Sequence, residues 1–467
     1  MSDKSERPVV IVSNRGPVSY RVENGVLVGT RGAGGLVSGL GPLLETGRAS
    51  WIAAALSDAD RAAVAAGISA PDGLAVRLLD LDPQDHALAY DLISNETLWF
   101  VHHGLFDLTR SPSYTADWFE AWDAYRRVNQ AFAQAVCESA PADAAVLIQD
   151  YHLTLMAPTL ALERPDLTTV HFHHTPFAGP DMLRVLPAVA RDEMLASLNA
   201  HDACGFHTQD WAENFQQDLH RWPPTSTDLA LDTGAKVFAS SLATDAEDLR
   251  STAASTGCVE HLRLLEEQLG DCQLVLRIDR MELSKNIRRG FQAFDLLLQQ
   301  RSDLREQVVF LACCYPSREN VAEYARYKED VLAEVERVNA RWRTANWQPI
   351  LLETDDNYLR SVAALRRYDV LVVNPIRDGL NLVAKEGPLI NEHFGSLVLS
   401  TEAGAWAELH SAALGINPFD VEQTAEMIGL ALDLAPSDRK AKATELAELV
   451  AERTPTDWLI DQLNAAS

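Results

Sequence analysis

Short apolar runs rich in β-branched residues alternate along this chain with longer stretches of helical periodicity, and no other feature limits the fold as strongly. The expected strands are Val9–Ser13, Ala145–Ile148, Thr169–His173, Val237–Ala239, Leu274–Ile278, Val308–Ala312, Val370–Val373 and Leu397–Ser400. Most of them follow a helix-like segment, such as Trp118–Ala140, Ile287–Gln300 or Val321–Arg341. This order is typical of mostly parallel sheets covered by helices, so the sequence predicts an α/β fold.

The length of 467 residues is too great for one ordinary core and favours two domains. An acidic, alanine-rich stretch at 244–255 precedes a fresh set of alternating elements that starts near Cys272. The predicted domains are 1–245, 246–445 and a terminal segment, 446–467. The terminal segment has a helical pattern, and it is expected to pack back on the first domain through an apolar stripe of Trp458, Leu459 and Leu463.

Charge and composition argue against several classes of function. The formal net charge is −27, which disfavours nucleic acid or an anionic membrane as a partner, because both require clustered Lys and Arg. No apolar run approaches the roughly 20 residues that span a bilayer, and the N-terminus has no signal-peptide pattern, so we expect a cytoplasmic protein. The six cysteines form no C-x-x-C pair, and no metal site is expected. The oligomeric state stays open, with a homo-oligomer as one alternative.

A glycine-rich turn follows the first expected strand. Arg15 comes directly after that strand, and Gly34 and Gly35 precede a run compatible with a helix. Glycines let backbone N–H groups approach a ligand, and a helix N-terminus adds partial positive charge, so such a turn suits a diphosphate. The dinucleotide fingerprint G-x-G-x-x-G is absent here, which argues against an NAD-linked oxidoreductase.

Polar side chains also follow two later strands of the first domain. Asp150 comes just after Ala145–Ile148, and His174 follows Thr169–His173. Ligands of parallel sheets bind at the carboxyl ends of the strands, so these groups are positioned to hydrogen-bond sugar hydroxyls. Successive residues of a strand point to opposite faces, so the histidines of this H-x-H-H segment are not expected to share a metal ion.

Basic residues follow two expected strands of the second domain. Arg280 and Lys285 come after Leu274–Ile278, and Arg318 comes after Val308–Ala312. A guanidinium offers phosphate oxygens a planar fork, and an ammonium offers them a point charge. Arg and Lys at this spacing, between a strand and a helix, therefore suit a pyrophosphate.

The most specific motif is the polar block Asn374–Glu386, which follows the strand Val370–Val373. Gly379 is expected to permit an unusual turn and to begin a helix whose N–H groups bind anionic or hydroxyl oxygens. Asp378 and Glu386, about two helical turns apart, are then placed to clamp sugar hydroxyls and a ribose.

Together these residues resemble the trehalose-6-phosphate synthase family of retaining glycosyltransferases, which have two Rossmann-like domains facing a central cleft (GT-B). The similarity extends from Ser13-Asn14-Arg15 to Gly415–Asp420, and its blocks stand in the family's order. The blocks include Gly34–Val37, Trp122–Asn129, Asp150–His152, His174–Phe177, Gly205–Thr208, Arg280, Ser284-Lys285, Pro316–Arg318, Arg377–Glu386 and Ala403–Ala405.

The resemblance implies roles for the matching residues. Arg280 and Lys285 would neutralise the donor diphosphate, with the Gly35 loop closing over it. The donor sugar and ribose would be held by Asp378, Gly379, Leu380, Asn381, Leu382, Val383 and Glu386. The acceptor would be held by Arg15, Trp122, Asp150, His174 and Arg318, of which Arg15 and Arg318 would grip its phosphate. The catalytic set would be Arg280, Lys285, Asp150 and His174, with neither a metal nor another cofactor.

The reaction that the resemblance implies joins a nucleotide-glucose to glucose 6-phosphate and gives α,α-trehalose 6-phosphate. The expected partners are therefore a nucleotide-glucose and a sugar phosphate. Such enzymes are thought to retain the anomeric configuration without a protein nucleophile, because the leaving phosphate receives the acceptor proton on the same face.

The base of the donor is a separate question. The loop that offers uracil an aromatic side chain in family members reads Glu353-Thr354-Asp355-Asp356-Asn357 here. A carboxylate cannot stack on uracil, but it can accept two hydrogen bonds from guanine, and losing such a match is costly. Asp355 and Asp356 therefore predict that GDP-glucose competes with or outperforms UDP-glucose, and a merely solvated loop is the alternative.

Several positions depart from the family pattern. The second Trp of W-x-G-W is Ala54, Gly104 replaces a phosphate-contacting Tyr, and Asn286 stands where Gly is usual. Changes on the acceptor side keep open a related (pseudo)glycosyltransferase with another phosphorylated acceptor, as in validoxylamine phosphate or glucosylglycerol phosphate synthesis. A catalytically inactive sensor of sugar phosphates is a third hypothesis, which the intact Arg280 and Lys285 oppose.

Overall fold

The computed structural model describes residues 7–31, 37, 40–41, 44, 47, 49–224 and 234–466. The chain divides into two compact units, Met1–Leu242 with Pro455–Ser467, and Ala243–Thr454. We call them the first and the second unit. The domain bounds expected from the sequence stay a prediction. Gly35, predicted to close over the donor, lies outside the described residues, and so does its neighbour Gly34.

The first unit is built on a parallel sheet. Within its described residues seven strands pair in the order β5-β4-β1-β6-β7-β8-β9, each parallel to its neighbours. Their bounds are β1 (Val9–Val12), β4 (Ala49–Ala54), β5 (Val76–Leu79), β6 (Ala145–Gln149), β7 (Thr168–His173), β8 (Ala203–Phe206) and β9 (Lys236–Ala239). Every residue of β1 and β6 is buried, as expected for central strands covered on both faces.

An antiparallel hairpin of β2 (Val18–Glu23) and β3 (Val26–Arg31) follows β1. The turn residues Asn24 and Gly25 have φ of 50° and 79°. Two central residues with positive φ form the tight turn that best matches the twist of paired strands, and Asn-Gly accepts this conformation readily.

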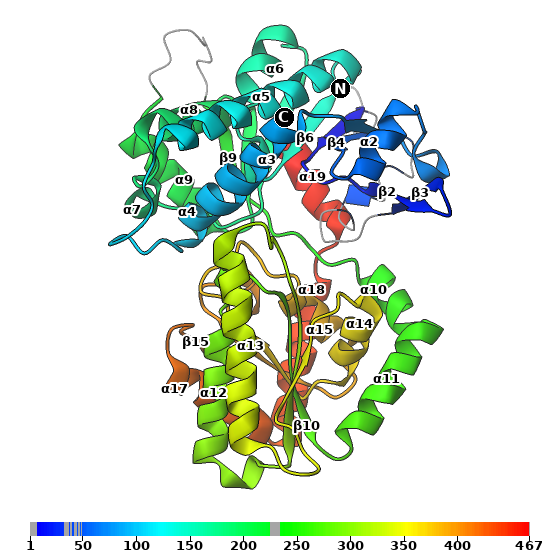
Figure 1. Ribbon diagram of the computed structural model, residues 1–467, viewed down its shortest axis with the longest axis vertical. Helices are drawn as coiled ribbons and strands as arrows, with labels where there is room; N and C mark the ends of the chain where they lie inside the picture. The colour runs from blue at the N-terminus through cyan, green and yellow to red at the C-terminus, as the bar shows by residue number, and fades with distance from the viewer. Residues whose placement is uncertain are drawn as a thin grey trace. The chain divides into compact units, whose positions relative to one another are not determined.

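Helices surround the sheet of the first unit (Figure 1). The helical segments are α2 (Asp58–Ala65), η2 (Pro71–Gly73), α3 (Pro83–Ala87), the π-helical η3 (Leu88–Leu98), α4 (Trp99–His103), α5 (Ala116–Ser139), η4 (Tyr151–Leu153), α6 (Ala157–Glu163), α7 (Pro180–Leu183), α8 (Ala188–Leu198), α9 (Gln209–Arg221) and α19 (Pro455–Ala465).

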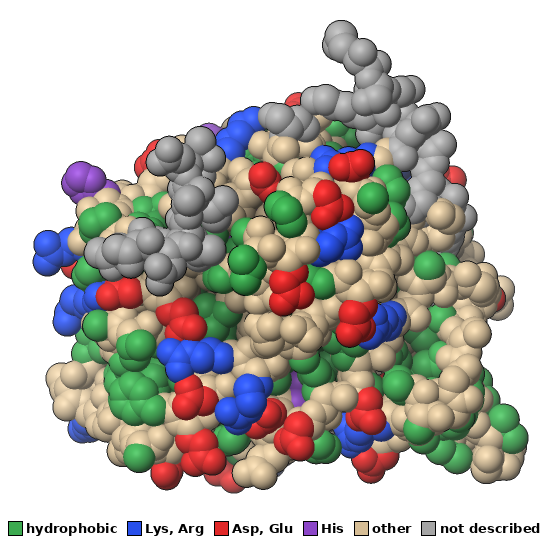
Figure 2. All heavy atoms as spheres, turned by 90° about the horizontal axis from the view of Figure 1, so that it is seen from above, with side chains coloured by type: hydrophobic (Ala, Val, Ile, Leu, Met, Phe, Trp, Pro, Cys, Tyr) green, Lys and Arg blue, Asp and Glu red, His purple; other side chains and the backbone are tan. Residues whose placement is uncertain are grey.

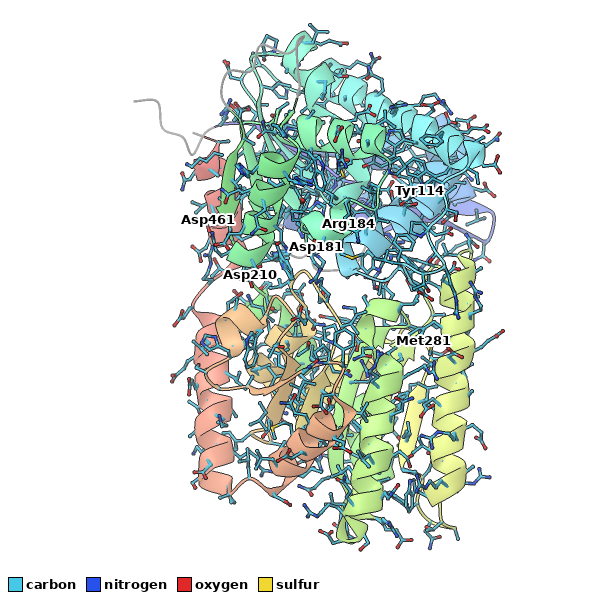
Figure 3. The ribbon with its side chains drawn as sticks, turned by 90° about the vertical axis from the view of Figure 1, so that its left-hand side faces the viewer. Tyr114, Asp181, Arg184, Asp210, Met281 and Asp461 are labelled. Carbon is cyan, nitrogen blue, oxygen red and sulfur yellow. The ribbon has the colours of Figure 1, made fainter. Side chains whose placement is uncertain are left out.

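The terminal helix α19 packs on the sheet of the first unit, as predicted, and it contacts β7 and β8. Trp458 is fully buried, and its ring centroid lies 4.9 Å from that of Phe172 in β7. Asp461 of the same helix (Figure 3) accepts a hydrogen bond of 2.7 Å from Ser240 Oγ. Polar contacts therefore reinforce the apolar stripe that the sequence indicated.

The second unit is built on another parallel sheet. In its described residues six strands pair in the order β12-β11-β10-β13-β14-β15, each parallel to its neighbours. Their bounds are β10 (Gln273–Arg280), β11 (Val308–Tyr315), β12 (Ile350–Glu353), β13 (Val370–Val373), β14 (Ser396–Ser400) and β15 (Leu414–Ile416). The strand β10 lies centrally in this sheet, so residues that follow it are placed beside the ends of β11 and β13.

Helices cover both faces of the second sheet, with α12 and α13 on one side and α10 and α11 on the other (Figure 1). The helical segments are α10 (Ala246–Ala254), α11 (Thr256–Leu269), η5 (Leu283–Lys285), α12 (Ile287–Gln300), η6 (Ser302–Leu304), α13 (Ala322–Trp342), α14 (Tyr358–Arg367), α15 (Val383–Ile390), α16 (Trp406–Leu409), α17 (Val421–Asp433) and α18 (Pro436–Ala451). In α12 the buried Ile287, Phe291, Phe294 and Leu298 recur every three or four residues, which places them on one face.

The α/β class is confirmed, and the predicted strands coincide with β1, β6, β7, β9, β10, β11, β13 and β14. On the face of the molecule shown in Figure 2, acidic and basic side chains are interspersed rather than separated by sign. Among the helices that the structure describes, none is both long and apolar enough to cross a membrane.

Candidate active site

The turn after β1 is fixed by hydrogen bonds that leave Arg15 exposed. The buried indole of Trp51 donates to Ser13 Oγ over 2.7 Å, and Ser13 Oγ donates to the backbone oxygen of Arg15 over 2.7 Å. Asn14 Oδ1 lies 3.1 Å from His86 Nε2. The polypeptide is therefore held rigidly up to the residue predicted to meet the acceptor phosphate.

Asp150 and His174 meet at the ends of β6 and β7, as their positions after successive strands predicted. The backbone N–H of Asp150 donates to Phe172 O over 2.7 Å, and Asp150 Oδ1 accepts from the backbone N–H of His174 over 3.2 Å. Asp150 has a φ of 74°, which is unusual for a residue other than glycine. Strain of this kind concentrates at functional sites, so the conformation marks Asp150 as a functional candidate.

The imidazole of His174 is oriented by two polar side chains. Its Nε2 lies 2.9 Å from Gln149 Oε1, which can only accept, so Nε2 carries the proton. Its Nδ1 then accepts from His207 Nε2 over 3.1 Å. Burial lowers the pKa of His174 to about 3, so the ring is neutral at physiological pH.

Trp122 is buried and packs against other side chains of the first unit. Only 1% of the residue is exposed, and its indole N–H donates to Glu193 Oε2 over 2.9 Å. Its ring stacks on Trp118 with the centroids 5.7 Å apart. The expected contact of Trp122 with the acceptor stays a prediction.

An aromatic column near Asp150 was missed by sequence reasoning. Tyr90 stacks between His86 and His152, with centroids 5.7 Å and 5.6 Å away. His152 Nδ1 lies 3.9 Å from Asp150 Oδ2, and His86 contacts Asn14. The block Asp150–His152 contained one member of the column, and the four-residue spacing of His86 and Tyr90 in a helical stretch was the signal for the other two.

In the second unit the ammonium of Lys285 lies among carboxylates. Its Nζ is 2.6 Å from Asp378 Oδ2 and 4.0 Å from Asp279 Oδ1. Burial opposes the charge of Lys285, but Asp378 and Asp279 outweigh burial and raise its pKa. Lys285 is therefore a cation at physiological pH.

Arg280 ends β10 directly before Met281 (Figure 3). Arg280 Nη1 lies 3.1 Å from Glu282 Oε1, and Arg318 Nε lies 3.9 Å from the same oxygen. The structure thus brings Arg280 and Arg318 together at one buried carboxylate, a relationship that the motif analysis did not foresee.

The left-handed conformation of Asn286 explains why glycine is usual at this position in the family. Its φ is 57°, a value that Asn tolerates better than most residues. Asn286 Nδ2 donates to the backbone oxygens of Asn374 and Pro418 over 3.0 Å and 2.7 Å. Asn286 thereby ties the Lys285 segment to the strand end that precedes Asp378.

The expectation that Gly379 begins a helix is wrong. The helix α15 begins at Val383, and the residues from Asp378 to Leu382 form a loop. The unusual φ belongs to Asn381, at 81°. Asn381 Oδ1 accepts from Ala384 N–H over 3.2 Å and so caps the helix start, a role that a helix from Gly379 would not need.

The loop from Asp378 to Leu382 lies directly against the segment that contains Gly404. Asp378 O accepts from Gly404 N–H over 3.0 Å, and Leu380 O accepts from Ala405 N–H over 2.8 Å. A Cβ atom added at Gly404 would lie 2.0 Å from Gly379 O. Only glycine allows the two backbones to approach this closely.

Glu386 lies in the first turn of α15, and burial raises its pKa to about 7. Asp355 and Asp356 are exposed between β12 and α14. The next residue but one, Tyr358, is half exposed at the start of α14. Burial and then the carboxylate of Glu386 raise the pKa of Tyr358 to about 12. Sequence reasoning missed Tyr358, although it was an aromatic residue next to the loop in question.

In the part of the chain that the structure describes, no three His, Cys, Asp or Glu side chains are grouped to hold a metal ion. The two parallel-sheet units, each with charged or hydrogen-bonding groups at its strand ends, are Rossmann-like domains, and their fold is that of the GT-B glycosyltransferases. The chain belongs to glycosyltransferase family 20, whose sequence profile it matches over residues 7–467.

Relatives with this family's architecture span the whole chain. The trehalose-6-phosphate synthase of Mycolicibacterium smegmatis is 33% identical over an alignment of 479 positions, which covers 98% of this chain and 92% of the relative. The solved structure of an α,α-trehalose-phosphate synthase (UDP-forming) from Burkholderia vietnamiensis is similar with a TM-score of 0.85 and 27% identity, covering 98% and 97% of the two chains. The enzyme from Burkholderia xenovorans in complex with glucose-6-phosphate has a TM-score of 0.85 and 26% identity, covering 98% and 99%.

Proposed function

We propose that this glycosyltransferase makes α,α-trehalose 6-phosphate from a nucleotide-glucose and glucose 6-phosphate. The placement of Arg280 and Lys285 beside the end of β10 carries the proposal, because a departing diphosphate needs cations fixed in advance. The names of the relatives support the product, and the bound glucose 6-phosphate of one relative supports the acceptor.

The proposed step breaks the bond between the anomeric carbon of glucose and the diphosphate oxygen. The acceptor hydroxyl attacks from the same face, and its proton passes to the leaving phosphate oxygen, so no protein nucleophile is required. Negative charge that grows on the diphosphate is met by the guanidinium of Arg280 and the ammonium of Lys285. Since two cations already oppose that charge, we propose that the reaction is independent of a metal ion.

Donor and acceptor are assigned to the residues that the resemblance marked. We propose that the donor sugar and ribose are held by Asp378, Gly379, Leu380, Asn381, Leu382, Val383 and Glu386. We propose that Arg15, Trp122, Asp150, His174 and Arg318 hold the acceptor. Both ring nitrogens of His174 are hydrogen-bonded to Gln149 and His207, so we propose that this neutral ring packs against the acceptor sugar and does not bind the phosphate.

For the base, we propose that GDP-glucose competes with or outperforms UDP-glucose. The exposed carboxylates of Asp355 and Asp356 are able to accept from guanine N1–H and its amino group. Tyr358 provides an aromatic face next to them, which stacks with either base and so does not discriminate. Initial rates with the two donors decide the question, and a clear preference for UDP-glucose contradicts the assignment of Asp355 and Asp356.

The function is tested by measuring activity with every combination of donor and acceptor. Purified protein is incubated with GDP-glucose or UDP-glucose and with glucose 6-phosphate, glycerol 3-phosphate or unphosphorylated glucose. The product is identified by mass and by the anomeric couplings in its NMR spectrum. We expect nucleoside diphosphate release that depends on glucose 6-phosphate, together with an α,α-linked product. If the protein binds these ligands but releases no nucleoside diphosphate with any acceptor, it is a sensor of sugar phosphates instead.

Another phosphorylated acceptor is the second candidate function. It is favoured by Gly104, which ends α4 with a φ of 65° at the position of a phosphate-contacting Tyr in the family. A higher rate with an acceptor such as glycerol 3-phosphate than with glucose 6-phosphate selects this alternative.

A further inference from the structure

The carboxylate of Glu282 is buried beside two arginines. The side chain of Glu282 is fully buried, and its Oε1 lies 3.1 Å from Arg280 Nη1 and 3.9 Å from Arg318 Nε. The same oxygen accepts a hydrogen bond of 3.2 Å from Ser317 Oγ. One atom therefore contacts both guanidinium groups that the proposed function gives to phosphates.

The backbone of Glu282 is tied to the same segment. Its N–H donates to Arg280 O over 2.7 Å, and its carbonyl accepts from Lys285 N–H over 3.0 Å. The position of the carboxylate is thus set relative to both cations proposed for the diphosphate.

Two guanidinium groups repel each other at short range unless an anion lies between them. A carboxylate is costly to bury by itself, and partners of opposite charge with good geometry offset that cost. At Glu282 the short contacts of Oε1 are with Arg280 at 3.1 Å and Ser317 at 3.2 Å, and Arg318 adds an ion pair at 3.9 Å. The arrangement gathers positive charge for incoming phosphates while keeping the protein stable without them.

The two arginines are held to different degrees. Arg318 is 8% exposed, has a φ of 52°, and donates from Nη1 to the Tyr324 hydroxyl over 2.7 Å. Arg280 keeps 43% of its side chain exposed. Arg318 is therefore held by two partners and presents a small surface to a ligand, whereas Arg280 is anchored through Nη1 and presents a larger one.

We infer that Glu282 is a positioning residue that orients Arg280 toward the donor diphosphate and Arg318 toward the acceptor phosphate. This role rests on the proposed function. One carboxylate then serves both phosphate sites, so the loss of this carboxylate weakens the binding of both substrates.

The test compares Glu282→Gln and Glu282→Asp with the wild-type enzyme. Glu282→Gln keeps the size of the side chain and removes its charge. Because hydrogen bonds to charged groups are the strong ones, we expect the KM for the nucleotide-glucose and the KM for the acceptor to rise about tenfold each. Glu282→Asp restores the charge on a shorter side chain and is expected to recover part of both losses.

The matched control is Glu334→Gln. Glu334 is also buried, and it holds Arg337, which is 47% exposed, over 2.7 Å on α13. We expect this variant to keep the wild-type KM values. A role of Glu282 in folding alone would lower the amount of active enzyme and leave both KM values unchanged, as would be seen by active-site titration.

Two outcomes overturn the inference separately. Wild-type KM values for both substrates in Glu282→Gln remove the positioning role while the proposed function stands. Wild-type protein that neither transfers glucose nor binds UDP or GDP in calorimetry removes the proposed function and the inference with it. If Glu282→Gln does not fold, Glu282→Asp decides, since wild-type KM values in that variant contradict a role that depends on the reach of the carboxylate.

Discussion

The ammonium of Lys285 lies 2.6 Å from Asp378 Oδ2, which joins a residue proposed for the diphosphate to a residue proposed for the sugar. The same oxygen accepts from Asn381 Nδ2 over 3.1 Å. A phosphate that binds Lys285 therefore competes with Asp378 for its protons. The pair holds the cation in place for the donor and keeps it charged although it is largely buried.

The first prediction concerns the charge of Lys285. Asp378 helps to raise its pKa against the effect of burial, so Asp378→Asn is expected to lower that pKa. Binding of GDP or UDP that depends on the ammonium should then be lost at a lower pH than in the wild type. Calorimetric titrations between pH 7 and pH 10 measure the shift. Asp330→Asn, which removes a carboxylate paired with Arg288 on the surface, is the control. If Asp378→Asn and the wild type lose nucleotide binding at the same alkaline pH, the proposed coupling of Asp378 to Lys285 is contradicted.

The second prediction concerns the loop from Asp378 to Leu382. Gly404→Ala places a methyl group 2.0 Å from Gly379 O, so one backbone segment must move. We expect a loss of stability of about 1–3 kcal/mol, typical of overpacking, and a weaker affinity for the nucleotide-glucose. The matched control is Gly429→Ala, whose added Cβ meets only the Leu297 side chain, at 3.1 Å. Thermal unfolding and donor KM are measured for both variants, and equal results for the two refute the account of Gly404.

The third prediction concerns acid stability. Burial lowers the pKa of His171 and His173, and that of His174 and His201 to about 3. The unfolded chain takes up these protons below its ordinary pKa of about 6.5 while the folded chain does not. Stability should therefore fall as the pH drops from about 6.5 toward 3, by about 1.4 kcal/mol per pH unit for each of His174 and His201, and His171 and His173 act in the same direction.

His201 allows this prediction to be tested at one residue. In the described part of the chain neither ring nitrogen of His201 has a hydrogen-bond partner, so His201→Leu loses no hydrogen bond. We expect the free energy of unfolding of His201→Leu to depend less steeply on pH between pH 6.5 and pH 4. His220→Leu, at an exposed position of α9, is the control. The same steepness in His201→Leu and the wild type contradicts the assignment.

The fold was predictable where strands are buried on both faces. Continuous apolar runs made β1, β6 and β11 evident. The strand β4 was missed because it is rich in alanine, which carries little strand preference, and β15 because it has only three residues. The start of α15 was misplaced because glycine and asparagine both permit unusual φ, and spacing alone does not show which of the two adopts it.

The site was predictable only as groups of residues at strand ends. The sequence placed Lys285 and Asp378 after two different strands, and both were singled out. Their direct contact, and the sharing of Glu282 by two arginines, depend on side chains from separate segments meeting in the folded chain. No pattern within one segment reports such a contact.

The turnover of Arg280→Ala and Lys285→Ala, measured with EDTA present, tests the central claim most directly. Removing a fixed charge that stabilises the departing diphosphate should lower kcat by on the order of a hundredfold or more in each variant. Arg263→Ala, which removes a surface cation of α11, should retain the wild-type rate. Wild-type turnover should not fall with EDTA. Near-normal rates in either Arg280→Ala or Lys285→Ala, or wild-type activity abolished by EDTA, would contradict the account.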